Sequence, residues 1–61
     1  MNVGDKVTYV GVNKKEHGII KRVCEDSTHY FVVYNCGGEW DKYMDYTAAK
    51  TAKMDLELGW I

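Results

Sequence analysis

One run of five residues constrains the fold of this chain more than any other feature. Residues 30–34 are Tyr-Phe-Val-Val-Tyr, an unbroken series of aromatic and β-branched side chains. Such residues favour extended strands, in which successive side chains point to opposite faces of a sheet. Both faces of this strand would then be apolar. The run therefore predicts a strand that is central in its sheet or covered on both sides.

Two further strands and two loops are predicted before this run. Residues 6–10 alternate polar and apolar side chains, which is typical of a half-buried strand. The β-branched side chains within residues 18–24 indicate a second strand. Residues 11–16 are polar and basic and predict a loop, and residues 25–28 are rich in side chains that bond their own backbone, which predicts a turn.

The second half of the chain carries signals for a hairpin, a helical turn and a last strand. Adjacent glycines predict a hairpin turn over residues 35–38, and a fourth strand follows over residues 39–43. Good helix formers in residues 47–53 predict one or two helical turns. Alternation returns in residues 55–61, which predict the last strand.

These elements together predict an all-β protein, a small five-stranded barrel with one short helical turn before the last strand. Closure of the sheet into a barrel would leave no exposed strand edges. The length of 61 residues accommodates one domain, residues 1–61. A domain of this size buries only about 60% of the surface of its unfolded chain, which leaves little room for a solvent-excluded active site. We therefore expect a protein that is not an enzyme and holds no cofactor.

The start of the chain and its hydropathy bear on its location. Residues 1–6 lack the basic and then apolar pattern of a secretory leader. No apolar stretch approaches the roughly 20 residues that a membrane span requires. We expect a cytoplasmic protein without membrane association, in which Cys24 and Cys36 are reduced.

Three motifs in the first half resemble a known group of domains. They are Val3-Gly4-Asp5-x-Val7, Gly18-x-Ile20-x-x-Val23 and Phe31-x-Val33. Their order resembles the opening of KOW, Tudor and related SH3-like barrel domains, in which a Gly-Asp-x-Val strand and a Gly-x-Val-x-x-Val strand flank a basic loop. The resemblance implies a five-stranded SH3-like barrel. It leaves the function open, because that fold serves many kinds of binding.

The second half resembles a different group of proteins. The motifs are Trp40-Asp41-x-Tyr43-x-x-Tyr46-Thr47-Ala48-Ala49 and Asp55-Leu56-x-x-Gly59-Trp60. They resemble small uncharacterised proteins of phages and mobile elements. This resemblance implies a setting, that of a small accessory factor, and brings no established chemistry with it.

Aromatic residues crowd one stretch of the chain and form the first candidate site. An exposed patch of aromatic rings binds protein partners, and ring faces also attract cations such as methylated lysine. The alternative is that most of these rings form the core of so short a chain. As the first choice we predict a surface for an unidentified protein partner, with two carboxylates at its rim. Its residues are Tyr30, Tyr34, Trp40, Asp41, Tyr43 and Asp45.

Basic residues in the first half form the second candidate site. Cations at the surface bind phosphates, so the segment from 14 to 22 predicts, as the alternative function, a KOW-like nucleic-acid-binding module. The competing interpretation is a solvated face, since the net charge of the whole chain is −1. The residues of this alternative site are Lys14, Lys15, Lys21 and Arg22.

The histidine and cysteine side chains are of types found in zinc sites and in nucleophilic catalysis. The two histidines and two cysteines are of the types that bind zinc, but no pair has the close spacing of a zinc knuckle. Cys24 or Cys36 with His29 and Asp26 contains the residue types of a nucleophilic triad, without any surrounding motif. We expect no metal site and no catalytic residue. The four residues are His17, Cys24, His29 and Cys36.

Trp60, next to the last residue, leaves two possibilities. It packs against the sheet, which is our expectation, or it leaves an apolar patch suited to a partner or a second copy. The number of copies in the assembly stays open.

Overall fold

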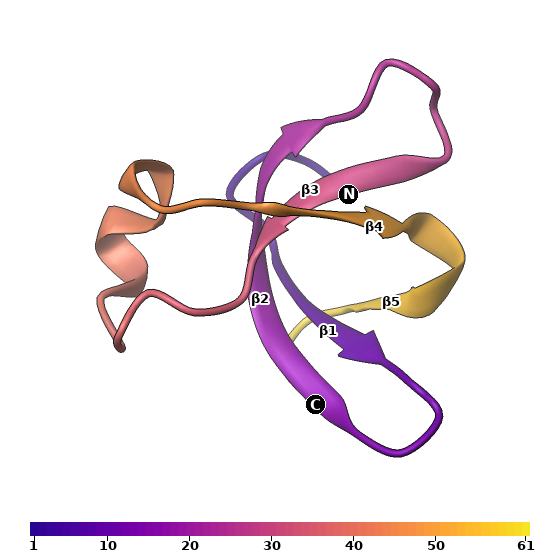
Figure 1. Ribbon diagram of the computed structural model, residues 1–61, viewed down its shortest axis with the longest axis horizontal. Helices are drawn as coiled ribbons and strands as arrows, with labels where there is room; N and C mark the ends of the chain where they lie inside the picture. The colour runs from indigo at the N-terminus through magenta and orange to yellow at the C-terminus, as the bar shows by residue number, and fades with distance from the viewer.

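The computed structural model describes all 61 residues and has five strands and two short 3₁₀ helices (Figure 1). The predicted all-β class is confirmed. The elements are β1 (Lys6–Val10), β2 (Lys15–Val23), β3 (His29–Val33), η1 (Trp40–Asp45), β4 (Ala49–Ala52), η2 (Lys53–Asp55) and β5 (Leu56–Leu58). Neither helix is long and apolar enough to cross a membrane.

The strands form one antiparallel sheet in the order β4-β3-β2-β1-β5. The first four strands follow each other as neighbours, and β5 returns to pair with β1. β4 and β5 are the two edges and do not pair with each other, so the sheet is not closed by hydrogen bonds.

The predictions for the first half of the chain hold with small changes. β1 has the predicted bounds, and β3 is displaced by one residue. β2 begins earlier than predicted, at Lys15, because Lys15 pairs with Val10 and the loop is a tight turn closed by a 2.9 Å hydrogen bond from Gly11 N to Lys14 O. The polar segment 11–16 is therefore partly strand.

The predicted fourth strand over residues 39–43 is wrong, because this segment enters η1. Gly37 and Gly38 have φ angles of +62° and +84°, as a turn requires, but the chain then coils instead of returning as a hairpin. Glu39 N donates to Cys36 O at 3.0 Å and Lys42 N donates to Glu39 O at 2.9 Å, which are turn bonds and not ladder bonds. Alternation of polar and apolar side chains over only five residues does not distinguish a strand from a short 3₁₀ helix.

The predicted helix over residues 47–53 is also wrong for most of its length. Residues 49–52 form β4, which pairs with β3 through Phe31 opposite Lys50 and Tyr30 opposite Thr51. Pairing with a preformed strand overrides the helix propensity of a short Ala-rich segment, which is marginal by itself. A helical turn does precede the last strand, but it is η2, at residues 53–55.

Both faces of the sheet carry buried side chains. The inner face holds a cluster of Val7, Ile20, Tyr30, Val32 and Leu56, and Tyr9 and Tyr34 pack against it. On the outer face Thr8, Ile19 and Val33 are buried, together with Cys36 from the turn after β3. Val32 and Val33 are both fully buried, so the expectation that this strand is covered on both sides is confirmed.

The last residues form a strap across the outer face of β1 and β2. The buried Thr8 hydroxyl donates to Gly59 O at 2.7 Å and accepts from Ile61 N at 3.1 Å. Trp60 Nε1 donates to Gly18 O at 2.9 Å, and its ring stacks on His17 with centroids 5.1 Å apart. Figure 1 shows this end of the chain beside the start of β2. Trp60 therefore packs against the sheet, as expected.

Candidate functional site

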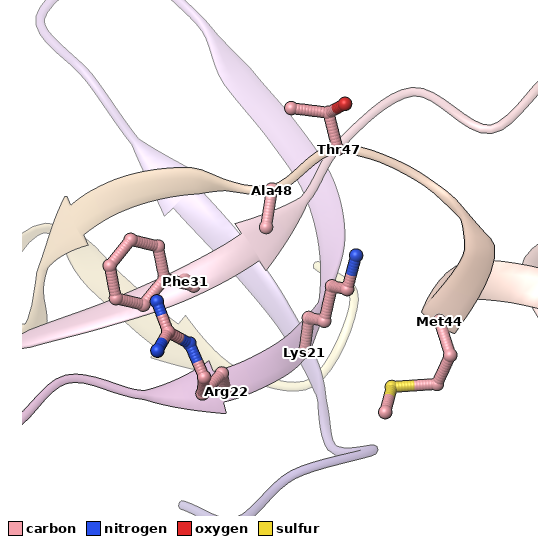
Figure 2. A pocket seen from close by; sticks show the side chains of 6 residues that line it. All are labelled: Lys21, Arg22, Phe31, Met44, Thr47 and Ala48. Atoms are coloured by element: carbon pink, nitrogen blue, oxygen red, sulfur yellow. The ribbon is translucent and has the colours of Figure 1, made fainter.

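The surface has three shallow hollows, of about 440, 510 and 360 Å³. The second lies beside the β2–β3 turn and η2, and the third is bordered by an ion pair between Lys14 and Glu16 with its N and O atoms 2.8 Å apart. The first combines cations with apolar groups from three parts of the chain, and we call it the groove. Its lining residues are Lys21, Arg22, Phe31, Met44, Thr47 and Ala48 (Figure 2).

A β-bulge places the basic side of the groove. Ile20 pairs with Val32, but the register then shifts so that Arg22, and not Lys21, lies opposite Phe31. In a regular ladder Arg22 would lie opposite Tyr30, whose side chain is in the core. The extra residue in β2 therefore moves Arg22 to the outer face beside Phe31, as bulges do when they redirect a side chain.

Arg22 and Phe31 form a cation–π pair at the floor of the groove. The guanidinium carbon of Arg22 lies 4.3 Å from the centre of the Phe31 ring. Figure 2 shows the two side chains next to each other, one from each strand. Arg22 is exposed and Phe31 half-buried, so the ring restrains the guanidinium while its N–H groups stay accessible.

Lys21 fixes the position of the segment that carries Thr47 and Ala48, which form one wall of the groove. Its ammonium group donates to Tyr46 O at 2.5 Å, which ties β2 to the chain directly after η1. Tyr46 is also anchored by its hydroxyl, which donates to Glu39 Oε2 at 3.0 Å, and this bond raises the pKa of the Tyr46 hydroxyl. The wall formed by Thr47 and Ala48 therefore rests on two polar contacts made by its neighbour.

Met44 completes the groove from η1. Met44 is 54% exposed. In Figure 2 it lies on the other side of Lys21 from Arg22 and Phe31. A flexible thioether is suited to contact with apolar side chains of varied shape.

The groove lining contains two cations and no carboxylate. Neither Lys21 nor Arg22 forms an ion pair with an acidic residue of the chain. The next cation is Lys50, which lies opposite Phe31 on β4 and is held by Asp26 at 3.7 Å. The charge that the groove presents is therefore positive.

The six residues predicted for a protein surface are divided between the two faces of the sheet. Tyr30 is 7% exposed and belongs to the core cluster. Tyr34 is half-buried, with its hydroxyl 2.8 Å from the Thr51 hydroxyl. The other four, Trp40, Asp41, Tyr43 and Asp45, lie in η1, where Trp40 packs on Trp60 with ring centres 5.0 Å apart. The structure does not bring the six together.

The four basic residues predicted for nucleic acid are also separated. Lys14 and Lys15 are at the β1–β2 turn, and Lys14 is paired with Glu16 at 2.8 Å. Lys21 and Arg22 are near the other end of β2, roughly 20 Å away at the rise of a strand. Only Lys21 and Arg22 meet in one site, the groove.

The histidines and cysteines do not converge. No group of three His, Cys, Asp or Glu side chains is placed to hold a metal ion. His17 stacks on Trp60 and Cys36 is buried. Cys24 and His29 flank the β2–β3 turn, and His29 Nδ1 lies 3.0 Å from Asp26 Oδ2 and 2.8 Å from the Thr28 hydroxyl. The imidazole therefore contacts Asp26 and Thr28 and not the Cys24 thiol.

Four lining residues of the groove, Phe31, Met44, Thr47 and Ala48, were outside the predicted sites. Of these only Phe31 carries a local signal, because it stands in the aromatic run of residues 30–34. Comparisons with protein-family models, with curated proteins and with solved structures found no match for this chain. We therefore infer the function from the chemistry of the residues that line the groove.

Proposed function

We propose that this chain is a non-enzymatic protein-binding module and that it binds its partner in the groove. The single observation that carries the proposal is the Arg22–Phe31 pair in the same groove as the exposed Met44, because accessible arginine, aromatic and methionine side chains are enriched at protein interfaces. Guanidinium, aromatic and thioether groups hold a ligand. None of them is a general base at neutral pH.

An SH3-like barrel is the architecture that we propose with this function. The return of β5 to β1 and the helical turn before it support it, together with the resemblance of the first half of the chain. Leu56 of β5 also packs in the same cluster as Tyr30 and Val32 of β3, so strands from the two halves of the sheet surround one core. The proposed setting, an accessory factor of a phage or mobile element, rests on resemblance alone.

A nucleic-acid-binding module remains the second candidate function. The observation that favours it is again the Arg22–Phe31 pair, because an aromatic ring with a cation can stack on a base. The net charge of −1 and the separation of Lys14 and Lys15 from the groove favour a protein ligand instead.

Selection from a displayed library of random peptides tests the proposal. The immobilised wild-type protein is compared with the double variant Arg22→Glu, Phe31→Ala, which alters the groove. The variant pair Lys14→Glu, Lys15→Glu serves as a matched control for charge at a remote place, the β1–β2 turn.

The proposal predicts peptides that are enriched by the wild type and by the control and lost with the groove variant. Enrichment that survives the groove variant would overturn it. Short single- and double-stranded DNA and RNA are titrated in parallel. Oligonucleotide binding that weakens steeply with salt, without peptide enrichment, would replace the first function with the second.

A further inference from the structure

We propose that the groove selects an extended peptide in which a carboxylate side chain lies next to a bulky apolar one. This inference rests on the proposed function and names the chemistry of its ligand. It follows from three properties of the lining residues: the sign of their charge, the way Arg22 is held, and the apolar side chains among them.

The charge of the groove favours an acidic group. Lys21 and Arg22 line it, no carboxylate does, and neither cation is neutralised by an acidic residue of the protein. No acid belongs to the lining: Asp26 lies 3.7 Å from Lys50, Glu39 accepts from the Tyr46 hydroxyl, and Asp45 follows Met44 as an exposed residue. A ligand carboxylate would therefore find charge complementarity here that the protein leaves unused.

The position of Arg22 favours a carboxylate, whose two oxygens match the guanidinium N–H groups, over an anion that is attracted by charge alone. The Phe31 ring, 4.3 Å from the guanidinium carbon, limits the freedom of the guanidinium group. A guanidinium that is restrained on one face still presents its N–H fork at the edge, which matches the two oxygens of a carboxylate. Lys21 is partly occupied by Tyr46 O and contributes its charge more than its hydrogen bonds.

The apolar residues of the groove favour an apolar neighbour for that carboxylate. Met44, Ala48 and Phe31 line the groove, and Met44 is 54% exposed. The volume of about 440 Å³ falls within the range of about 300–1,000 Å³ that small ligands occupy, so it holds a few side chains and not a folded domain. The net charge of −1 and the distance of Lys14 and Lys15 from the groove disfavour a polyanion, so we assign the groove to a peptide.

Four pools of fluorescent octapeptides test the inference by fluorescence anisotropy. One pool contains acidic and apolar residues, one basic and apolar, one acidic and small polar, and one apolar and small polar. The acidic–apolar pool is expected to bind tightest. The variant Arg22→Gln should weaken its binding about tenfold, towards the level of the pool without charge. Arg22→Lys keeps the charge but not the fork and should lie between the two.

Two further variants make the result specific. Met44→Ser removes the apolar contact and should weaken binding of the acidic–apolar pool but not of the acidic–polar pool. Lys15→Gln removes a remote cation from the same strand and should change nothing. Dispersed amide spectra of each variant show that it is folded, since all three side chains are largely exposed.

The possible outcomes separate this inference from the proposed function. Binding of the basic–apolar or uncharged pool as tightly as the acidic–apolar pool, with loss in Met44→Ser, would overturn the inference and leave a peptide-binding groove. Failure of all four pools would overturn both. Binding that is unaffected by Arg22→Gln, Arg22→Lys and Met44→Ser would place the ligand elsewhere and also contradict both.

Discussion

Val33 and Val12 differ completely in what surrounds them, although both are valines near strand ends. Val33 is fully buried on the outer face of β3, and Val12 is 99% exposed at the β1–β2 turn. Burial of apolar surface, and not residue type, decides how much each contributes to the free energy of unfolding. The sequence predicts the burial of Val33, because it stands in the Tyr30–Tyr34 run. It marks Arg22 as a candidate binding residue but not the face of the sheet on which its side chain lies, which the bulge decides.

Truncation of Val33 should destabilise the protein far more than truncation of Val12. Val33→Ala should lower the free energy of unfolding by about 1–3 kcal/mol, because it leaves a cavity in packed surroundings. Val12→Ala should change it by less than about 0.5 kcal/mol. Urea denaturation followed by tryptophan fluorescence measures both. Equal stability of the two variants would show that Val33 is not in the core.

The elements show where local patterns predict structure and where they do not. The run from Tyr30 to Tyr34 was predictable, because aromatic and β-branched residues favour a strand wherever it pairs. Residues 49–52 were not, because only their ladder with β3 makes the Ala-rich segment a strand. The groove was not predictable either. Its lining comes from three segments, and a one-residue bulge near Lys21 selects the side chain that faces Phe31.

The tie between β2 and η1 is testable through Lys21. Lys21→Met keeps most of the side chain but removes the donor to Tyr46 O, so the segment after η1 should open more readily. We expect a loss of about 1 kcal/mol in the free energy that protects amides of residues 40–46, measured by hydrogen exchange. Lys42→Met, which removes an exposed cation from η1 itself, is the control. Identical exchange in the two variants would contradict a structural role for this bond.

The β2–β3 turn predicts a pH dependence. The hydrogen bond from Thr28 N, at 2.9 Å, holds the pKa of Asp26 well below its usual range, assisted by the Cys24 and Thr28 side chains and by His29. In the unfolded chain this carboxyl has a pKa of about 3.9. Its contribution to stability is therefore complete above about pH 5 and is lost as the pH falls through the unfolded and then the folded value.

Thermal melts between pH 6 and pH 2 measure this contribution. The wild type should lose melting temperature on acidification more steeply than Asp26→Asn, which cannot titrate. Asp41→Asn, at an exposed position in η1, controls for the general effect of removing a carboxylate. A wild-type slope equal to that of Asp26→Asn would mean that the turn does not depend on the ionised carboxylate.

At the scale of the whole molecule, a five-stranded sheet carries buried side chains on both faces in only 61 residues. The inner face holds the cluster of Val7, Ile20, Tyr30, Val32 and Leu56, and η1 and the strap that contains Trp60 cover part of the outer face. The tilted contact between Trp40 and Trp60 joins these two covers, and Lys6 lies over Trp60 at 4.8 Å. Trp60 therefore supports η1, the helix that carries Met44 and precedes Thr47 and Ala48 of the groove.

Substitution of Trp60 should lower the stability of the whole domain in steps, as its contacts are removed. Trp60→Phe keeps an aromatic ring but loses the donor to Gly18 O, and should lower the free energy of unfolding by about 1 kcal/mol. Trp60→Ala also loses the packing on His17 and Trp40 and should cost about 3 kcal/mol. Met54→Ala, at a side chain that is 90% exposed, should be neutral. Calorimetry that ranks Trp60→Ala with Met54→Ala would show that the strap does not stabilise the sheet.

The most direct measurement is a map of backbone amide shifts in labelled protein as the best peptide from the display selection is added. The account predicts that the largest changes fall on the amides of residues 21–22 and 31 and of residues 44–48, the segments that line the groove. It also predicts that they disappear in Arg22→Glu, Phe31→Ala. Changes centred instead on residues 13–16 at the β1–β2 turn, or on the exposed side of β5, would contradict the groove as the binding site.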